Sequence, residues 1–130
     1  MNVVSTVTSQ LDRIRDRLFL GSISRSEKVY LHTTRFTVPH GNTTERLRVW
    51  ILVRAKGMVE AESHAETRLK EILLEHDELV VADKDFKKLK PRELTVATLH
   101  DESEGVLQLL HTMRREAKRV VSSVERTEIN

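Results

Sequence analysis

Four cations and an indole share one predicted strand face, and these residue types together are able to bind nucleic acid. Every second residue from 46 to 56 belongs to the series Arg46, Arg48, Trp50, Leu52, Arg54 and Lys56. Guanidinium and ammonium groups bind phosphates, and a flat aromatic ring stacks on an unpaired base. In the alternative, a terminal helix covers Trp50 and Leu52 while the cations extend past its edges. We favour this structural role, because a small domain seldom leaves a central Trp-Leu pair bare.

A second set of residues has the spacing that helices use to pack against each other. Steps of four and three separate six residues near the C-terminus: Val106, Leu110, Met113, Ala117, Val120 and Val124. Two apolar positions in every seven form the seam of a coiled coil. The N-terminal segment has a similar series: Val4, Val7, Leu11, Ile14 and Leu18. Either the two terminal helices pack together within one chain, or the C-terminal helix pairs with a second copy.

The remaining reactive residues show no catalytic or metal-binding spacing. His76-Asp77-Glu78 and His100-Asp101-Glu102 each place an imidazole beside carboxylates, but the sequence has no His-Glu-x-x-His pattern. It has no cysteine, which excludes disulfides, thiolate nucleophiles and sulfur-rich zinc sites. No phosphate loop, nucleophile elbow or dinucleotide fingerprint is present. We therefore predict a protein that is not an enzyme and that uses no cofactor and no metal.

Length and composition indicate one folded domain. The chain has 130 residues, of which 38% are hydrophobic and 32% are charged. Its net charge of +2 is too even a balance to require a polyanionic partner. No apolar run reaches the roughly 18 residues of a membrane span, and the first residues lack the pattern of a signal peptide. We expect an intracellular protein without membrane contact, in the host cytoplasm or, for a phage structural protein, in the virion.

The first half of the chain predicts a helix followed by a hairpin. The series from Val4 to Leu18 indicates an amphipathic N-terminal helix within residues 1–20, closed by Gly21. Strands over residues 29–38 and 46–56 flank the turn sequence Pro39-His40-Gly41-Asn42 and should pair. We expect the second strand to continue past Gly57 to Ala61.

The second half of the chain predicts a helix, two short strands and a longer helix. Ser63 and Glu66 have the spacing of a capping box, which indicates a helix from about His64. Short strands follow over residues 79–82 and 94–99, separated by a charged connector over 83–92. Asp101 should cap the last helix, which reaches residue 126.

These elements give the order α-β-β-α-β-β-α and an α+β fold in one domain, residues 1–130. We expect an N-terminal helix over 1–20, a sheet of about four largely antiparallel strands with the central helix over 28–100, and a C-terminal helix over 101–126.

Residues 57–89, GMVEAESHAETRLKEILLEHDELVVADKDFKKL, carry one local resemblance to a known family. The matching features are a strand that ends Val59-Glu60-Ala61-Glu62-Ser63, a helix that opens at that serine, and the run Glu78-Leu79-Val80-Val81 leading into Asp85-Phe86. This quarter of the chain resembles the β-α-β unit of the DpnD/PcfM-like family of phages and mobile elements. The resemblance implies an origin in such an element and brings no catalytic residues with it.

Together these observations predict a non-enzymatic assembly or adaptor protein of phage or mobile-element type. It should act through protein-protein surfaces as a homo-oligomer, binding itself and an unidentified protein. The predicted oligomer interface is Val106, Leu110, Met113, Ala117, Val120 and Val124. The alternative is a nucleic-acid-binding module that uses Arg46, Arg48, Trp50, Arg54 and Lys56.

Overall fold

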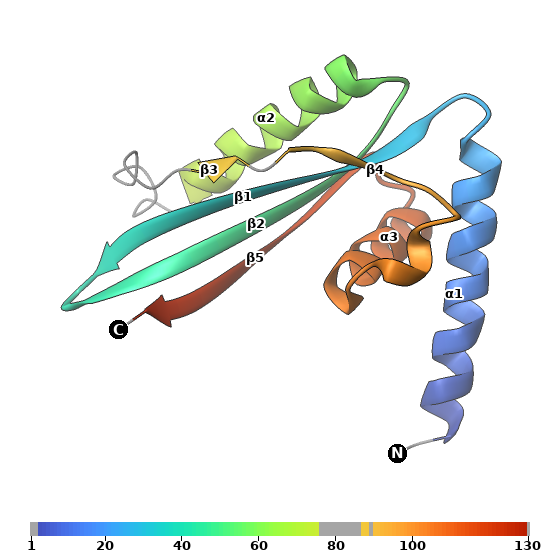
Figure 1. Ribbon diagram of the computed structural model, residues 1–130, viewed down its shortest axis with the longest axis horizontal. Coiled ribbons are helices and arrows are strands. Elements are labelled where there is room, and N and C mark those ends of the chain that lie inside the picture. The colour runs from blue at the N-terminus through green and yellow to red at the C-terminus, as the bar shows by residue number, and fades with distance from the viewer. Residues whose placement is uncertain (1–2, 76–86, 89, 130) are drawn as a thin grey trace.

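The computed structural model describes residues 3–75, 87–88 and 90–129, and it shows an α+β fold built on an antiparallel sheet (Figure 1). Strands β1 (Lys28–His40) and β2 (Thr43–Ala55) form a long hairpin. Strand β5 (Val120–Ile129) pairs with the other side of β2. The short strands β3 (Lys87–Lys88) and β4 (Arg92–Leu94) pair with the outer side of β1.

Helices lie on both faces of this sheet. Helix α2 (Met58–Glu75) covers one face, while α1 (Val3–Ile23) and α3 (Glu104–Glu116) pack against the other. A short 3-10 helix, η3 (Leu99–Asp101), precedes α3. The sheet therefore separates two hydrophobic clusters. Figure 1 shows that the strands extend well past α3 toward the hairpin turn, so the helices α1 and α3 stand at one end of their face.

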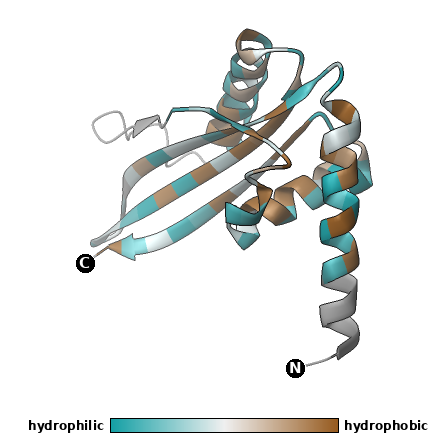
Figure 2. Cartoon of the chain, turned by 45° about the vertical axis from the view of Figure 1, so that its right-hand side comes forward, coloured by the Kyte–Doolittle hydropathy of each residue, from teal (hydrophilic) through white to brown (hydrophobic). Residues whose placement is uncertain are grey.

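Strand alternation explains why β2 serves both clusters. Its odd-numbered residues Leu47, Val49, Ile51 and Val53 are buried toward α2, and Leu52 is buried on the opposite side with α1 and α3. Successive strand residues point to opposite faces, which requires this division. Figure 2 shows the alternation as brown and teal bands along the strands.

The predicted hairpin and N-terminal helix are confirmed, with changes at their ends. The hairpin turns at Gly41, whose φ of 62° lies in the left-handed region that glycine adopts without steric cost. Helix α1 ends at Ile23 rather than near Leu20, so Gly21 lies inside the helix instead of closing it.

The predicted continuation of β2 to Ala61 and the helix start near His64 are wrong. Helix α2 begins at Met58. The Lys56 amide donates to Oε2 of Glu60 at 3.3 Å, and the Ala61 amide donates to the Gly57 carbonyl at 3.0 Å. These bonds use backbone amides and a carbonyl at the start of the helix. Because α2 begins at Met58, Ser63 lies inside the helix and does not cap it.

The helix predicted over residues 101–126 is present only over Glu104–Glu116, so its extension to residue 126 and the α-β-β-α-β-β-α order are wrong. The cap is Ser103, whose Oγ accepts from the Val106 amide at 3.4 Å, rather than Asp101. Ala117 adopts a left-handed φ of 51° and ends α3. The following β-branched residues favour a strand and form the edge that pairs with β2.

Two further strand predictions are corrected or lie outside the described residues. The strand predicted over residues 94–99 is wrong, because β4 ends at Leu94 and Leu99 belongs to η3. The strand predicted over 79–82 and half of the connector over 83–92 lie outside the described residues, although Lys87–Lys88 forms β3. In the described part of the chain, no helix is both long enough and apolar enough to cross a membrane.

Candidate interaction surfaces

The basic strand face predicted from the sequence is real, but it is divided into two halves. The residues Arg46, Arg48, Trp50, Leu52 and Arg54 point away from α2, as their alternation requires. We call the end of this face near α1 and α3 the proximal half, which comprises Val29, Leu31, Leu52, Arg54 and Val121. The end near the hairpin turn is the distal half, which comprises Thr33, Arg35, Thr37, Arg46, Arg48, Ser123, Glu125 and Thr127.

In the proximal half, Arg54 is held by the protein itself. Its Nε donates to Oε1 of Glu27 at 2.8 Å, and its guanidinium lies 6.0 Å from the ring centroid of Phe19. Glu27 also accepts from Arg119. The hydrogen bond from Arg119 and that from Arg54 hold the pKa of Glu27 below its ordinary value, against burial, which raises it. Arg54 therefore stabilises the fold and is not available to a ligand.

Lys56 also leaves the predicted nucleic-acid face. It follows the last residue of β2, Ala55, and its amide takes part in the start of α2. The predicted face thus loses Arg54 and Lys56 for separate reasons.

The distal half gains an arginine that the sequence analysis missed. Arg35 of β1 is the register partner of Arg48 of β2, and Thr37 is the partner of Arg46. We call Arg35, Arg46 and Arg48 the arginine cluster. The Gly41-Asn42 turn fixes the pairing of the two strands, so assigning faces to residues 29–38 would have revealed Arg35.

The arginine cluster has little negative charge around it. Among the side chains that the structure describes, none places a carboxylate within 4.0 Å of these three guanidinium groups. Glu125 of β5 stands at the register position of Arg48, and Ser123 and Thr127 flank it. In β3, the backbone of Lys87 pairs with Arg35.

Trp50 marks the boundary between the halves. Its indole is partly buried against the proximal cluster, and its register partners are Thr33 and Ser123. Trp50 therefore packs against the core on one side and leaves some of its surface open.

The residues of the predicted oligomer interface do not share one helix. Val106, Leu110 and Met113 of α3 are buried in the chain's own core, with 3%, 0% and 0% of their surface exposed. Ala117 is the left-handed residue that ends α3. Val120 and Val124 lie in β5 and pack on the α2 side of the sheet. Helices α1 and α3 do pack together within one chain, but through Leu20 and Ile23 and not through Leu11, Ile14 and Leu18.

Helix α1 packs through a different face from the one its apolar spacing predicts. Leu11, Ile14 and Leu18 are 48%, 53% and 69% exposed, and we call them the α1 stripe. The side chains of Val4 and Val7, which continue the same spacing in the sequence, lie outside the described residues. A shallow groove along the stripe is lined by Ile14, Leu18 and Val96, with Arg17 and Arg25 beside it.

Ion pairs explain this orientation of α1. Asp16 is 3% exposed and accepts from Nε of Arg114 at 2.7 Å, and Asp12 lies 3.6 Å from Nη2 of the same arginine. Nδ1 of His111 is 3.8 Å from a carboxylate oxygen of each aspartate. These contacts turn the acidic side of α1 toward α3, so the stripe faces away.

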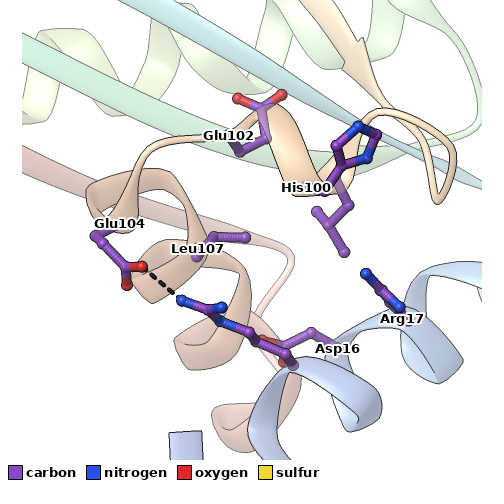
Figure 3. Close-up of a pocket in the computed structure, with 8 residues that line it drawn as sticks. Asp16, Arg17, His100, Glu102, Glu104 and Leu107 are labelled. Atoms are coloured by element: carbon purple, nitrogen blue, oxygen red, sulfur yellow. Dashed lines mark hydrogen bonds and ion pairs between the residues drawn. The ribbon is translucent and has the colours of Figure 1, made fainter. Parts of the chain in front are cut away.

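A small cavity of about 140 Å³ lies between α1, η3 and α3 (Figure 3). Its carboxylates are already paired: Glu104 with Arg13 at 2.8 Å, Asp16 with Arg114, and the buried Glu102 with Arg92 at 2.6 Å. The hydrogen bond to Glu102 raises the pKa of Arg92, although burial lowers it. These groups hold three elements together, and the cavity lacks a free acid-base pair among its described carboxylates.

The predicted histidine triplets differ in what the structure shows of them. His76-Asp77-Glu78 lies outside the described residues. Nε2 of His100 is 3.3 Å from Asp101, and both side chains are exposed, whereas Glu102 is buried with Arg92. Among the described residues, no three histidine or carboxylate groups gather as a metal site would require.

We compared the chain with family models, curated proteins and solved structures. No family model, no curated protein and no solved structure matches this chain.

Proposed function

We propose that this chain is a non-enzymatic assembly or adaptor protein that acts through protein-protein contacts as a homo-oligomer. The observation that carries the proposal is the exposed α1 stripe. Three large aliphatic side chains in a row, each about half or more exposed, form an apolar surface that water solvates poorly. Such surfaces are typical of sites that another protein covers.

The spacing of the stripe favours another helix as its partner. Leu11, Ile14 and Leu18 are separated by three and four residues, and the sequence continues this pattern through Val7 to Val4. This is the seam of a two-helix coiled coil. Figure 1 shows the N-terminal half of α1 extending beyond α3.

Charge favours an antiparallel pair of α1 helices over a parallel one. Arg15 and Arg17 occupy the positions that flank the stripe near one end, and Thr8 and Gln10 occupy those near the other end. A parallel pair gathers four arginines within one turn. An antiparallel pair instead sets each arginine beside a neutral residue of the second copy, which avoids like-charge repulsion.

The apolar surface of the α1 stripe is large enough to offset part of the cost of forming a dimer. Complete burial of a Leu or Ile side chain is worth about 1.5 to 3 kcal/mol. Association costs about 4 to 15 kcal/mol in lost freedom. Leu11, Ile14 and Leu18 are about half covered already in the single chain, so burying the rest of them in two copies contributes about 5 to 10 kcal/mol, which offsets the lower part of this cost.

The proposal relocates the interface and keeps the remaining expectations. The interface moves from Val106, Leu110, Met113, Ala117, Val120 and Val124 to α1. We propose that the protein works inside the cell and also binds an unidentified protein. Its origin in a phage or mobile element rests on the resemblance of residues 57–89 alone. In that segment, Val59 to Ser63 belong to α2 and not to a strand, and residues 78–81 lie outside the described residues.

Light scattering and sedimentation of a charge-bearing variant test the proposal. The unmodified protein should be a dimer or larger at micromolar concentration, because the stripe is apolar. Leu18→Glu should be a folded monomer, since Leu18 is 69% exposed in the single chain, and its unfolding temperature should not vary with protein concentration as that of the oligomer does.

Leu74→Glu is the matched control, because Leu74 of α2 is 78% exposed and lies outside the stripe. It should remain oligomeric. A monomeric unmodified protein at high micromolar concentration overturns the proposal. Equal dissociation of the Leu18 and Leu74 variants overturns the placement of the interface on α1.

A further inference from the structure

The arginine cluster is not explained by the stability of the sheet. Arg35 and Arg48 are direct cross-strand partners, and like charges in such positions repel each other. Elsewhere the described arginines of this sheet have acidic partners: Arg54 binds Glu27, and Arg126 binds Glu45 at 3.1 Å. Among the described residues, no carboxylate lies within 4.0 Å of these three guanidinium groups, which favours an anion from outside the chain as their partner.

The spacing of the cluster suits a chain of phosphates. Arg46 and Arg48 lie on one face of one strand, so their Cα atoms are about 6.7 Å apart. Successive phosphates of an extended single strand have a comparable separation. Arg35 widens the positive surface onto the neighbouring strand, and planar guanidinium groups bind phosphate oxygens in pairs.

The neighbouring indole identifies the anion as one that carries bases. Trp50 follows Arg48 on the same face and keeps part of its surface open. Its register partners Thr33 and Ser123 both have small hydroxyl side chains. A flat ring next to phosphate-binding cations is the arrangement on which unpaired bases stack.

We propose that the distal half binds single-stranded nucleic acid, with Arg35, Arg46 and Arg48 on the phosphates and Trp50 against a base. This site lies at the hairpin end of the sheet, and α1 packs at the opposite end of the face. The proposal is therefore independent of oligomerisation through α1, and the monomeric Leu18→Glu variant should still bind.

Titration of the full-length protein with a fluorescein-labelled oligothymidylate tests the site. Anisotropy reports binding, and Trp50, the only tryptophan, reports stacking through its own emission. With three phosphate contacts, affinity should fall about twentyfold between 50 and 200 mM salt. Arg48→Gln should weaken binding and reduce the slope of log affinity against log salt by about 0.7.

Trp50→Leu should weaken binding roughly tenfold, because leucine keeps apolar contact with the core but cannot stack. Arg126→Gln is the matched control. It removes the same charge from β5 on the opposite face of the sheet and should bind as the unmodified protein does.

Several results overturn the proposal. These are no saturable binding at 50 mM salt, equal weakening by Arg126→Gln and Arg48→Gln, and tighter binding of a duplex than of the single strand. Full competition by polyglutamate at matched charge, without a change in Trp50 emission, also overturns it, because it assigns the surface to an acidic peptide.

Discussion

The proximal and distal halves of one sheet face share strand β2, but they differ in whether their arginines have acidic partners. In the proximal half, Leu52 is completely buried and Arg54 is fixed by Glu27. Trp50 at the boundary and Arg48 in the distal half are again an apolar residue and an arginine two positions apart, but both are only partly covered. The alternation along β2 is uniform, so the strand itself does not decide between structure and binding.

What decides is the set of elements that packs on each half. Helices α1 and α3 bring Leu20, Val106 and Leu110 to the proximal half, and the connection before β1 brings Glu27. The distal half receives Glu125 from β5 as its described carboxylate, and that group does not reach the arginines. A charged strand residue therefore becomes structural when a second element supplies its partner.

The largest expected effect comes from shortening a proximal side chain. Leu52→Ala should lower the free energy of unfolding by about 2 to 5 kcal/mol, because it leaves a cavity in a closed cluster. Arg46→Ala, on the same strand and face, should lower it by less than about 1 kcal/mol. Denaturant melts of both variants measure the contrast. Similar losses in the two variants would show that the halves do not differ in packing.

An intermediate effect should follow from removing the carboxylate that holds Arg54. Glu27→Gln should cost about 1 to 3 kcal/mol at neutral pH, since it removes charged hydrogen bonds in a side chain that is mostly buried. The pKa of Glu27 is lowered from 4.5, so its ionic contribution is present above pH 4.5 and is lost as the pH falls below that value. The difference between variant and unmodified protein should therefore shrink in acid.

Glu104→Gln is the control for this pH experiment. Glu104 pairs with Arg13 at the same 2.8 Å, but both side chains are more than half exposed. Its loss should change stability by less than about 1 kcal/mol at any pH. If the Glu104 and Glu27 variants lose the same stability in melts from pH 3 to 7, the buried ion pairs of Glu27 contribute no more than an exposed pair does.

The smallest expected effect is a gain in stability, not a loss. Arg48→Thr should raise the free energy of unfolding by about 0.2 to 0.5 kcal/mol, because it removes the repulsion with Arg35 and introduces a residue that favours strands. Added salt should stabilise the unmodified protein more than the variant, since it screens that repulsion. Arg54→Thr, tested beside it, should be destabilising. Equal destabilisation by both substitutions would contradict an arginine cluster kept for binding.

The sequence predicted the elements whose signals are local. The Gly41-Asn42 turn and the alternation of β2 were sufficient for the hairpin, and apolar spacing was sufficient for α1. The end of α3 was missed because Val120 and Val124 continue the helical spacing across Ala117, which ends the helix without a glycine. The start of α2 was missed because Met58 and Val59 resemble a strand.

The candidate surfaces were predicted only in part, because they depend on contacts distant in sequence. Arg46, Arg48 and Trp50 were placed correctly on one face. Arg54 differs from them because it contacts Glu27 and Arg119, and no sequence pattern around residue 54 predicts these contacts. The orientation of α1 depends in the same way on Arg114, which draws Asp12 and Asp16 inward and turns Leu18 out.

The pairing of β5 with β2 has a consequence for the time course of folding. The hairpin closes through neighbours such as His40 and Thr43, whereas β5 joins β2 through pairs as distant as Thr44 and Ile129. Contacts distant in sequence form slowly, since the chain must close a long loop before the contact stabilises it. We therefore expect the edge of β2 to stay open for a time after the hairpin has formed. During this interval its apolar residues are exposed to other unfinished chains, which makes the late arrival of β5 the step at which aggregation competes with folding.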